Sequence, residues 1–257
     1  MRSKRITPAE RRHMDYLRRK GLKVGHAYEQ RLIKLRRKEL RRVLNICKDY
    51  GTGMWDDVIR TQFSEDYLFD WYKGLYLDVG LPRAKSTARD LSLGKATPED
   101  DHWLRELTRY AEDRAGSEIV SVQGTMRDKL VNIVRDTMTA SPEMGIEKLA
   151  RSIAKDYGDM EIWMARRIAQ TETMIGMADA SAMAASTLDV AFTKKWAISG
   201  LGNTRDSHEA MDGKEVDENE PFILPDGAHM MYPHDGSQGA PAGEIINCAC
   251  DCLRIPK

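Results

Sequence analysis

The residues best suited to chemistry gather near the C-terminal end of the sequence. Cys248, Cys250 and Cys252 occupy every second position, and His208 precedes them. Thiolate and imidazole are the ligands that zinc prefers. In an extended segment, side-chain alternation would place all three thiols on one face. The pattern predicts a structural Zn²⁺ site with these four residues as ligands. The alternative is that the cysteines are small buried apolar residues.

Two further histidines, His229 and His234, stand among turn-forming residues. They are weaker ligand candidates and are interpreted as loop residues. The cysteine spacing differs from the disulfide framework of a secreted domain, which scatters cysteine pairs along a small chain. In a cytosolic protein such a cluster indicates reduced thiols or a metal site.

The same region contains a possible base next to carboxylates. If Thr204 or Asp206 caps a short helix that Gly213 ends, His208 and Asp212 share one helix face. A metal-dependent nuclease or hydrolase could use such a pair. However, the sequence has no phosphate-binding glycine loop, no nucleophile elbow and no His-Glu-x-x-His. We expect the protein not to be an enzyme, and keep the nuclease or hydrolase as the alternative.

The elements that must position these residues predict an α+β fold. Turn signals and short apolar pieces fill residues 189–257, which indicates a small α+β module with short strands. We call residues 189–257 the C-terminal module. Residues 27–188 have the apolar periodicity of helices. The expected helices are 27–50, 64–80, 97 to about 138 with a break near Gly116 or Gly124, one from Ser141, and 159–186, with a polar loop at 81–96.

The charge distribution is strongly asymmetric although the net charge is zero. Residues 1–48 contain 17 basic and 4 acidic residues, a net charge of +13, and the rest of the chain carries −13. Residues 1–26, which Pro8, Gly21 and Gly25 interrupt, are interpreted as a basic arm with at most one helix, from Pro8 to about Lys20. This pattern favours an anionic partner, although a solvated helix face has a similar composition. The candidate nucleic-acid contacts are Arg11, Arg12, Arg18, Arg19, Lys20, Arg36 and Arg37.

No apolar run approaches the roughly 18 residues of a membrane span. The first residues are basic but lack the apolar stretch of a secretory signal. We therefore expect a protein that is made in the cytoplasm and does not enter a membrane.

An ordered set of short motifs covers residues 148–253. Its members are Thr171, Glu172, Trp196, Arg205, His208, Asp212, Gly213, Tyr232, Pro233, Asn247, Cys248 and Cys250. In order and spacing this set resembles the Mu F-like minor head proteins of tailed bacteriophages, also called phage head morphogenesis proteins. Two departures fall in the cysteine segment: Ala249 stands where the family usually has Arg, and Cys252 is an additional thiol.

The resemblance implies a low-copy structural protein of the virion that acts in head morphogenesis at the portal. The expected partners are the portal protein, the major capsid or scaffolding protein, and packaged double-stranded DNA that enters or leaves the head. Residues 27–188 would be the docking region for portal or capsid. The protein would be made in the host bacterial cytoplasm and end in the head interior or at the portal vertex. A free-standing nucleic-acid-binding regulator built on the basic arm is a further alternative.

Overall fold

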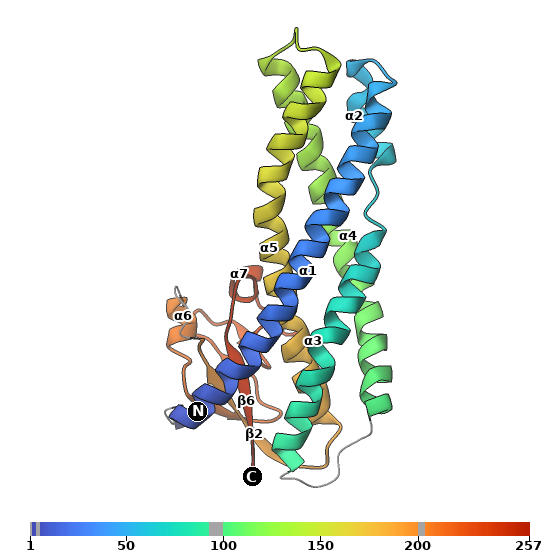
Figure 1. Cartoon of the computed structure of the whole chain (residues 1–257). Coiled ribbons are helices and arrows are strands. Elements are labelled where there is room, and N and C mark those ends of the chain that lie inside the picture. Colours follow the sequence, from blue (N-terminus) through green and yellow to red (C-terminus); the bar gives the residue numbers. More distant parts are fainter. Residues whose placement is uncertain (1, 4–5, 93–99, 200–203) are drawn as a thin grey trace. The chain divides into compact units, whose positions relative to one another are not determined.

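The protein has an α+β fold, as the sequence predicts. The computed structural model describes residues 2–3, 6–92, 100–199 and 204–257 (Figure 1). The long helices are α1 (Pro8–Lys48), α3 (Tyr67–Ser92), α4 (Asp100–Ala140) and α5 (Ile146–Ser186). The short ones are η1 (Thr52–Met54), α2 (Trp55–Gln62), α6 (Asp206–Glu209) and α7 (Ala242–Ile245).

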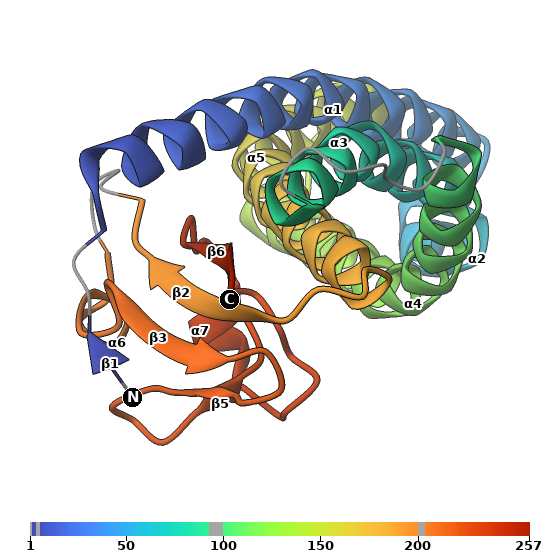
Figure 2. The same ribbon diagram turned by 90° about the horizontal axis from the view of Figure 1, so that it is seen from below.

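The strands form two small antiparallel sheets. The first has the order β1-β3-β2-β6, with β1 (Arg2–Ser3), β3 (Lys214–Asp217), β2 (Phe192–Ala197) and β6 (Asp251–Pro256) (Figure 2). The second pairs β4 (Phe222–Ile223) with β5 (His229–Met230). In the first sheet Trp196 lies opposite Cys252, so the last cysteine belongs to a paired strand.

The chain divides into two compact units, and the long helices contribute residues to both. The sheet unit comprises Met1–His26, Gly74–Arg109 and Ala169–Lys257. The bundle unit comprises Ala27–Lys73 and Tyr110–Ile168. Residues 1–26 are therefore no separate arm, because from Pro8 onward they are the first part of α1 and belong to the sheet unit.

Helix α1 runs through Gly21 and Gly25, which the sequence suggested as breaks. A Cβ atom at Gly21 would lie 2.1 Å from the sulphur of Met177, and one at Gly25 would lie 2.3 Å from Oγ1 of Thr173. Both glycines thus leave room for the side chains of α5. Their function is close helix packing rather than a turn.

Other predicted helix boundaries were also wrong. Helix α3 continues through Gly80 and Pro82 to Ser92, where a polar loop was expected. Helix α4 has no break at Gly116 or Gly124, and α5 is continuous through Asp159. The start signal at residues 97–98 lies outside the described residues. The change from helices to strands falls where predicted, since α5 ends at Ser186 and β2 begins at Phe192.

Each unit has its own apolar core. In the bundle unit α1, α2, α4 and α5 contribute to one cluster, with Trp55 and Tyr157 fully buried. In the sheet unit a second cluster surrounds Trp196, whose ring packs edge-on against Phe222 at 5.3 Å between centroids. Within the described residues, no helix combines the length and apolarity needed to cross a membrane.

Candidate metal centre

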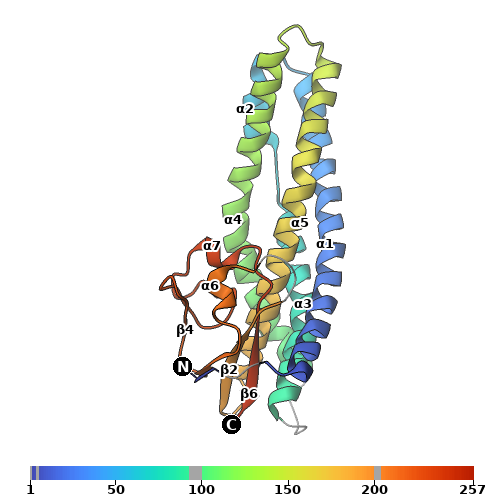
Figure 3. The ribbon, with the colours of Figure 1, turned by 90° about the vertical axis from the view of Figure 1, so that its left-hand side faces the viewer.

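The short helix α6 presents His208 to the interior of the C-terminal module. Two contacts tie α6 to the segment that precedes the cysteines. The Arg205 guanidinium donates a hydrogen bond to the carbonyl oxygen of Ile246, and the Ser207 hydroxyl donates one to Glu244, 2.9 Å away on α7. Figure 3 shows α6 and α7 next to each other. These contacts fix His208 relative to the cysteine segment, although they are separated in sequence.

A tight turn brings the first two cysteines to His208. Asn247 has a φ of 55°, in the left-handed region that asparagine tolerates well. Its backbone N–H donates a hydrogen bond to Oγ1 of Thr171 on α5 at 3.2 Å. Strand β6 begins only at Asp251, so of the three cysteines only Cys252 lies in a paired strand. His208 gathers two of the three thiols, and the expectation that alternation would place all three on one face was wrong.

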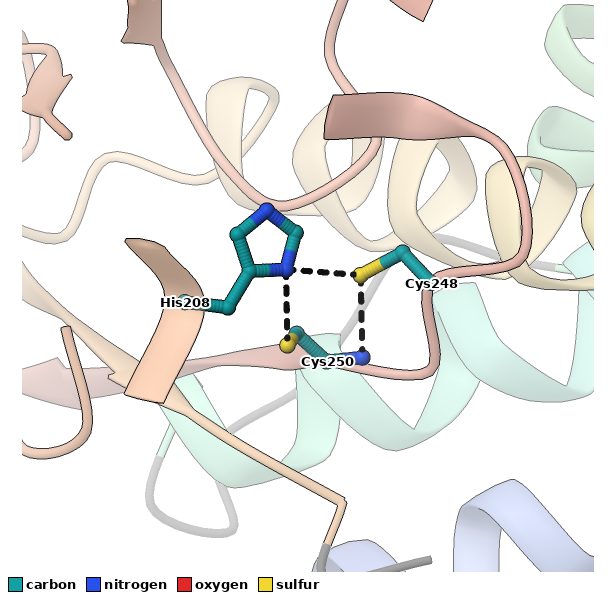
Figure 4. A group of neighbouring side chains, drawn as sticks. All are labelled: His208, Cys248 and Cys250. Atoms are coloured by element: carbon teal, nitrogen blue, oxygen red, sulfur yellow. Dashed lines mark hydrogen bonds between the residues drawn. The ribbon is translucent and has the colours of Figure 1, made fainter. Parts of the chain in front are cut away.

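His208, Cys248 and Cys250 form a compact buried group that can hold a metal ion (Figure 4). Nδ1 of His208 lies 3.4 Å from Sγ of Cys248 and 3.5 Å from Sγ of Cys250. The three potential ligand atoms lie within 4.8 Å of one another, and no residue of the group is more than 3% exposed. We call this set the thiol–imidazole group.

Glu244 and Trp196 contact the His208 ring. Nε2 lies 2.7 Å from Oε2 of Glu244, whose side chain is 13% exposed, but the two atoms do not form a hydrogen bond. Nδ1 faces the two sulphur atoms. Trp196 packs edge-on against the other side of the ring at 5.3 Å between centroids.

The two thiols differ in acidity. The pKa of Cys248 is lowered well below its usual range, chiefly because the Cys250 thiol donates a hydrogen bond to it, with further contributions from the neighbouring histidines. The same interaction raises the pKa of Cys250, and burial adds to that effect. A metal ion that binds both sulphurs must displace any proton that they hold.

The structure separates two predicted residues from this group. Cys252 is buried, but its Sγ faces the carbonyl oxygen of Leu253 at 3.7 Å. The Asp212 carboxylate accepts hydrogen bonds from Ile198 N–H and from Arg11, each at 3.0 Å. Cys252 is thus no ligand of the same ion, and Asp212 is held by other partners instead of acting jointly with His208.

His234 was misjudged from the sequence as an ordinary loop residue. Its side chain is only 3% exposed, and its φ is 76°. The sequence signal for the turn, Tyr232-Pro233-His234-Asp235-Gly236, was visible, but burial of the ring was not. His229 was also interpreted as a loop residue, but it lies in strand β5 with its side chain exposed.

The predicted nucleic-acid contacts fall into different environments. Arg18 and Arg36 are 2% and 0% exposed, so neither can reach a phosphate, and this part of the prediction is corrected. Arg18 instead hydrogen-bonds Asp15 and the carbonyl oxygen of Ser199. Arg11 is bound to Asp212. The exposed members of the set are Arg12, Arg19, Lys20 and Arg37.

Arg36 is the centre of a buried charged cluster in the bundle unit. Its guanidinium lies 3.6 Å from the Glu65 carboxylate, while Glu161 lies 3.6 Å from Arg37 and also interacts with Arg36. Burial raises the pKa of Glu65 and of Glu161 to about 7, against the opposing effect of the arginines. We call Arg36, Glu65 and Glu161 the Arg36 cluster. The amino-acid sequence did not indicate this cluster.

Comparisons of this chain with protein-family models, with curated protein sequences and with solved structures found no match. The function is therefore inferred from the residues themselves and from how they contact one another.

Proposed function

We propose that the chain is a minor head protein of a tailed bacteriophage, a non-enzymatic virion component that acts at the portal. The proposal starts from the ordered motif set that resembles the Mu F-like family. The observation that carries it is that members of this set, although far apart in sequence, contact one another in the sheet unit.

The contacts link the motif residues pairwise. Thr171 binds Asn247, Trp196 packs on His208, and His208 contacts both Cys248 and Cys250. In addition, the Gly213 N–H donates a hydrogen bond to the Trp196 carbonyl oxygen at 2.9 Å. A chance collection of short motifs would not be expected to form one connected set. The contacts support the interpretation that these residues maintain a particular fold.

We further propose that the thiol–imidazole group binds Zn²⁺ as a structural ion. Two thiolates and an imidazole suit zinc. Burial of the whole group favours a structural ion, because a catalytic zinc keeps a position open to water or substrate.

The head-protein proposal is tested on purified particles of the phage that carries this chain. Mass spectrometry of procapsids and mature virions is expected to find the polypeptide at low copy number, comparable with the portal protein. Removal of the coding sequence should leave particles that assemble or package DNA poorly. Absence of the polypeptide from both kinds of particle would overturn the proposal.

A basic groove in the bundle unit is the proposed site of contact with packaged DNA. It has a volume of about 600 Å³. Its charged lining residues are Lys34, Arg37 and Arg41 on α1 and Lys155 and Asp159 on α5. Several cations beside one carboxylate would favour phosphates through a sequence-independent interaction that weakens as salt concentration rises.

We predict that replacing Lys34, Arg41 and Lys155 by Gln weakens retention of double-stranded DNA and makes it less sensitive to salt. Loss of three phosphate contacts should reduce the slope of log affinity against log salt by roughly 3. Arg37 is left in place because it also pairs with buried Glu161.

A charge-matched control carries Gln at the exposed positions Arg31, Lys38 and Lys148 of the same helices, outside the groove. The control should retain most of the salt-dependent affinity. An equal loss in both triple variants would show that net charge, and not the groove, determines DNA binding.

A further inference from the structure

His234 has the features of a metal ligand. It lies in the loop between β5 and α7, and its Nε2 is 3.0 Å from the carbonyl oxygen of Cys250. A carbonyl oxygen only accepts hydrogen bonds, so Nε2 must carry a proton, and in the neutral ring Nδ1 carries the lone pair. Nδ1 is buried and has no hydrogen-bond partner among the described residues. A buried acceptor without a partner is costly, and this suggests that it has an unseen one.

The hydrogen bond to the Cys250 carbonyl oxygen places the His234 ring beside the cysteine segment. The loop itself is held by Asp235, whose buried carboxylate accepts hydrogen bonds from the N–H groups of Met231 and Ser237, each at 2.8 Å. His234 is therefore kept beside the cysteine segment by a fixed loop.

The two histidines offer the same ring atom. Nδ1 of His208 faces the two sulphur atoms, and His234 presents Nε2 to a carbonyl oxygen, so its Nδ1 is also available as a ligand atom. An outer acceptor like the one on His234 fixes the tautomer of a metal-binding histidine. Of the other nearby candidates, Glu244 accepts a hydrogen bond from Ser207, Asp251 is paired with Arg83, and Cys252 faces Leu253.

We propose that Nδ1 of His234 is the fourth ligand of the metal ion, and that it completes a tetrahedral site of two thiolates and two imidazoles. This inference rests on the zinc centre of the proposed function. His234 lies outside the compact group of three, so binding must draw its ring inward. Zinc displaces the protons of both thiols and takes one lone pair from each histidine. With four protein ligands the site is closed to water, which is the arrangement of a structural zinc.

The test compares His234→Asn with His234→Asp. Both residues tolerate a positive φ and have nearly the same shape, but only the aspartate offers the charged oxygen that zinc accepts as a ligand. The full chain is loaded with Zn²⁺, and its affinity is measured by competition with a chelator. The visible absorption of the Co²⁺-loaded protein reports the coordination geometry independently of affinity.

We expect His234→Asn to weaken Zn²⁺ binding by roughly 100-fold or more, since loss of an outer partner alone costs 10–100-fold. Its Co²⁺ spectrum should also change. His234→Asp should recover part of the affinity, and His229→Asn, at an exposed position, should match the wild type.

Three results would overturn or redirect the inference. Wild-type affinity and an unchanged Co²⁺ spectrum in His234→Asn would show that His234 is not a ligand. An equal loss of Zn²⁺ affinity in the Asn and Asp variants would show that His234 has a packing role, and would also overturn the inference. Absence of zinc binding by the wild-type chain would instead overturn the metal centre of the proposed function.

Discussion

The thiol–imidazole group and the Arg36 cluster differ in how buried negative charge is compensated. Each buries groups that become negatively charged, and a buried anion needs a positive partner. In the bundle unit the chain supplies this partner itself, since Arg36 lies next to Glu65 in the interior. In the sheet unit two thiols face Nδ1 of His208. There, we propose, a bound metal ion provides the charge.

The difference determines what each cluster depends on. A cation that is part of the chain is always present, so the Arg36 cluster depends on helix packing alone. A bound ion can be removed, so the stability of the sheet unit would depend on metal supply. A chelator should therefore remove the cation from the sheet unit. In the bundle unit only a mutation of Arg36 can remove it.

The largest expected effect is the loss of the metal through Cys250→Ser. Apparent binding free energies of structural zinc are about 10–16 kcal/mol, so a module built around the ion should lose its cooperative unfolding transition. Chelation of the wild-type chain should have the same effect. The measurements are zinc content by elemental analysis and thermal unfolding followed by circular dichroism.

Cys252→Ser is the matched control, because Cys252 is equally buried and lies in the same motif but faces Leu253. It should retain one equivalent of zinc. If Cys250→Ser and Cys252→Ser lose zinc alike, or if a chelator leaves unfolding unchanged, the contrast between the two clusters fails.

The second largest effect is expected from Arg36→Met in the bundle unit. Removing one partner of a buried ion pair typically costs about 3–5 kcal/mol, because the remaining charge is left uncompensated. Arg60→Met is the control, since Arg60 and its partner Asp128 are 44% and 63% exposed and such pairs contribute about 1 kcal/mol at most. Denaturant unfolding gives both values. If both variants lost the same small free energy of unfolding, Glu65 and Glu161 would be neutral and would need no cation.

The two clusters also differ in how far the sequence reveals them. His, Cys and turn residues are distinctive, so the three residues of the thiol–imidazole group could be found by inspection. Cys252 was wrongly included because it lies in strand β6, where its sulphur faces the carbonyl oxygen of Leu253 instead of His208. Burial of His234 depends on contacts with Cys250 that its local sequence does not contain.

The Arg36 cluster was missed because its members are ordinary charged residues in helices far apart along the chain. One local signal was available. Arg36 continues the i, i+4 series of Leu32 and Leu40, both buried, and so lies on the apolar face of α1. Likewise Gly21 and Gly25 resembled helix breaks, because a sequence cannot distinguish a turn glycine from one that admits a neighbouring helix.

The smallest expected effect is a pH dependence of opposite sign in the two clusters. Glu65 and Glu161 have pKa values raised from 4.5 to about 7, so between these values the folded state binds more protons than the unfolded state. The stabilisation that comes from proton binding by Glu65 and Glu161 is fully present below pH 4.5 and is lost as the pH rises through about 7. Glu65 alone should contribute on the order of 1–3 kcal/mol. Metal binding to thiols changes in the other direction, since protons compete with the ion at low pH.

Unfolding of the bundle unit is therefore expected to need less denaturant at pH 8 than at pH 5.5, measured with chelator present so that the metal contributes nothing. Glu65→Gln mimics the protonated carboxyl and should flatten this dependence, whereas Glu147→Gln, at a side chain that is 68% exposed, should not. A bundle that becomes more stable toward pH 8 would show that Arg36 keeps both carboxylates ionised. The Arg36 guanidinium would then compensate fully for the cost of burying the two carboxylates, as the metal ion is proposed to do for the two thiolates.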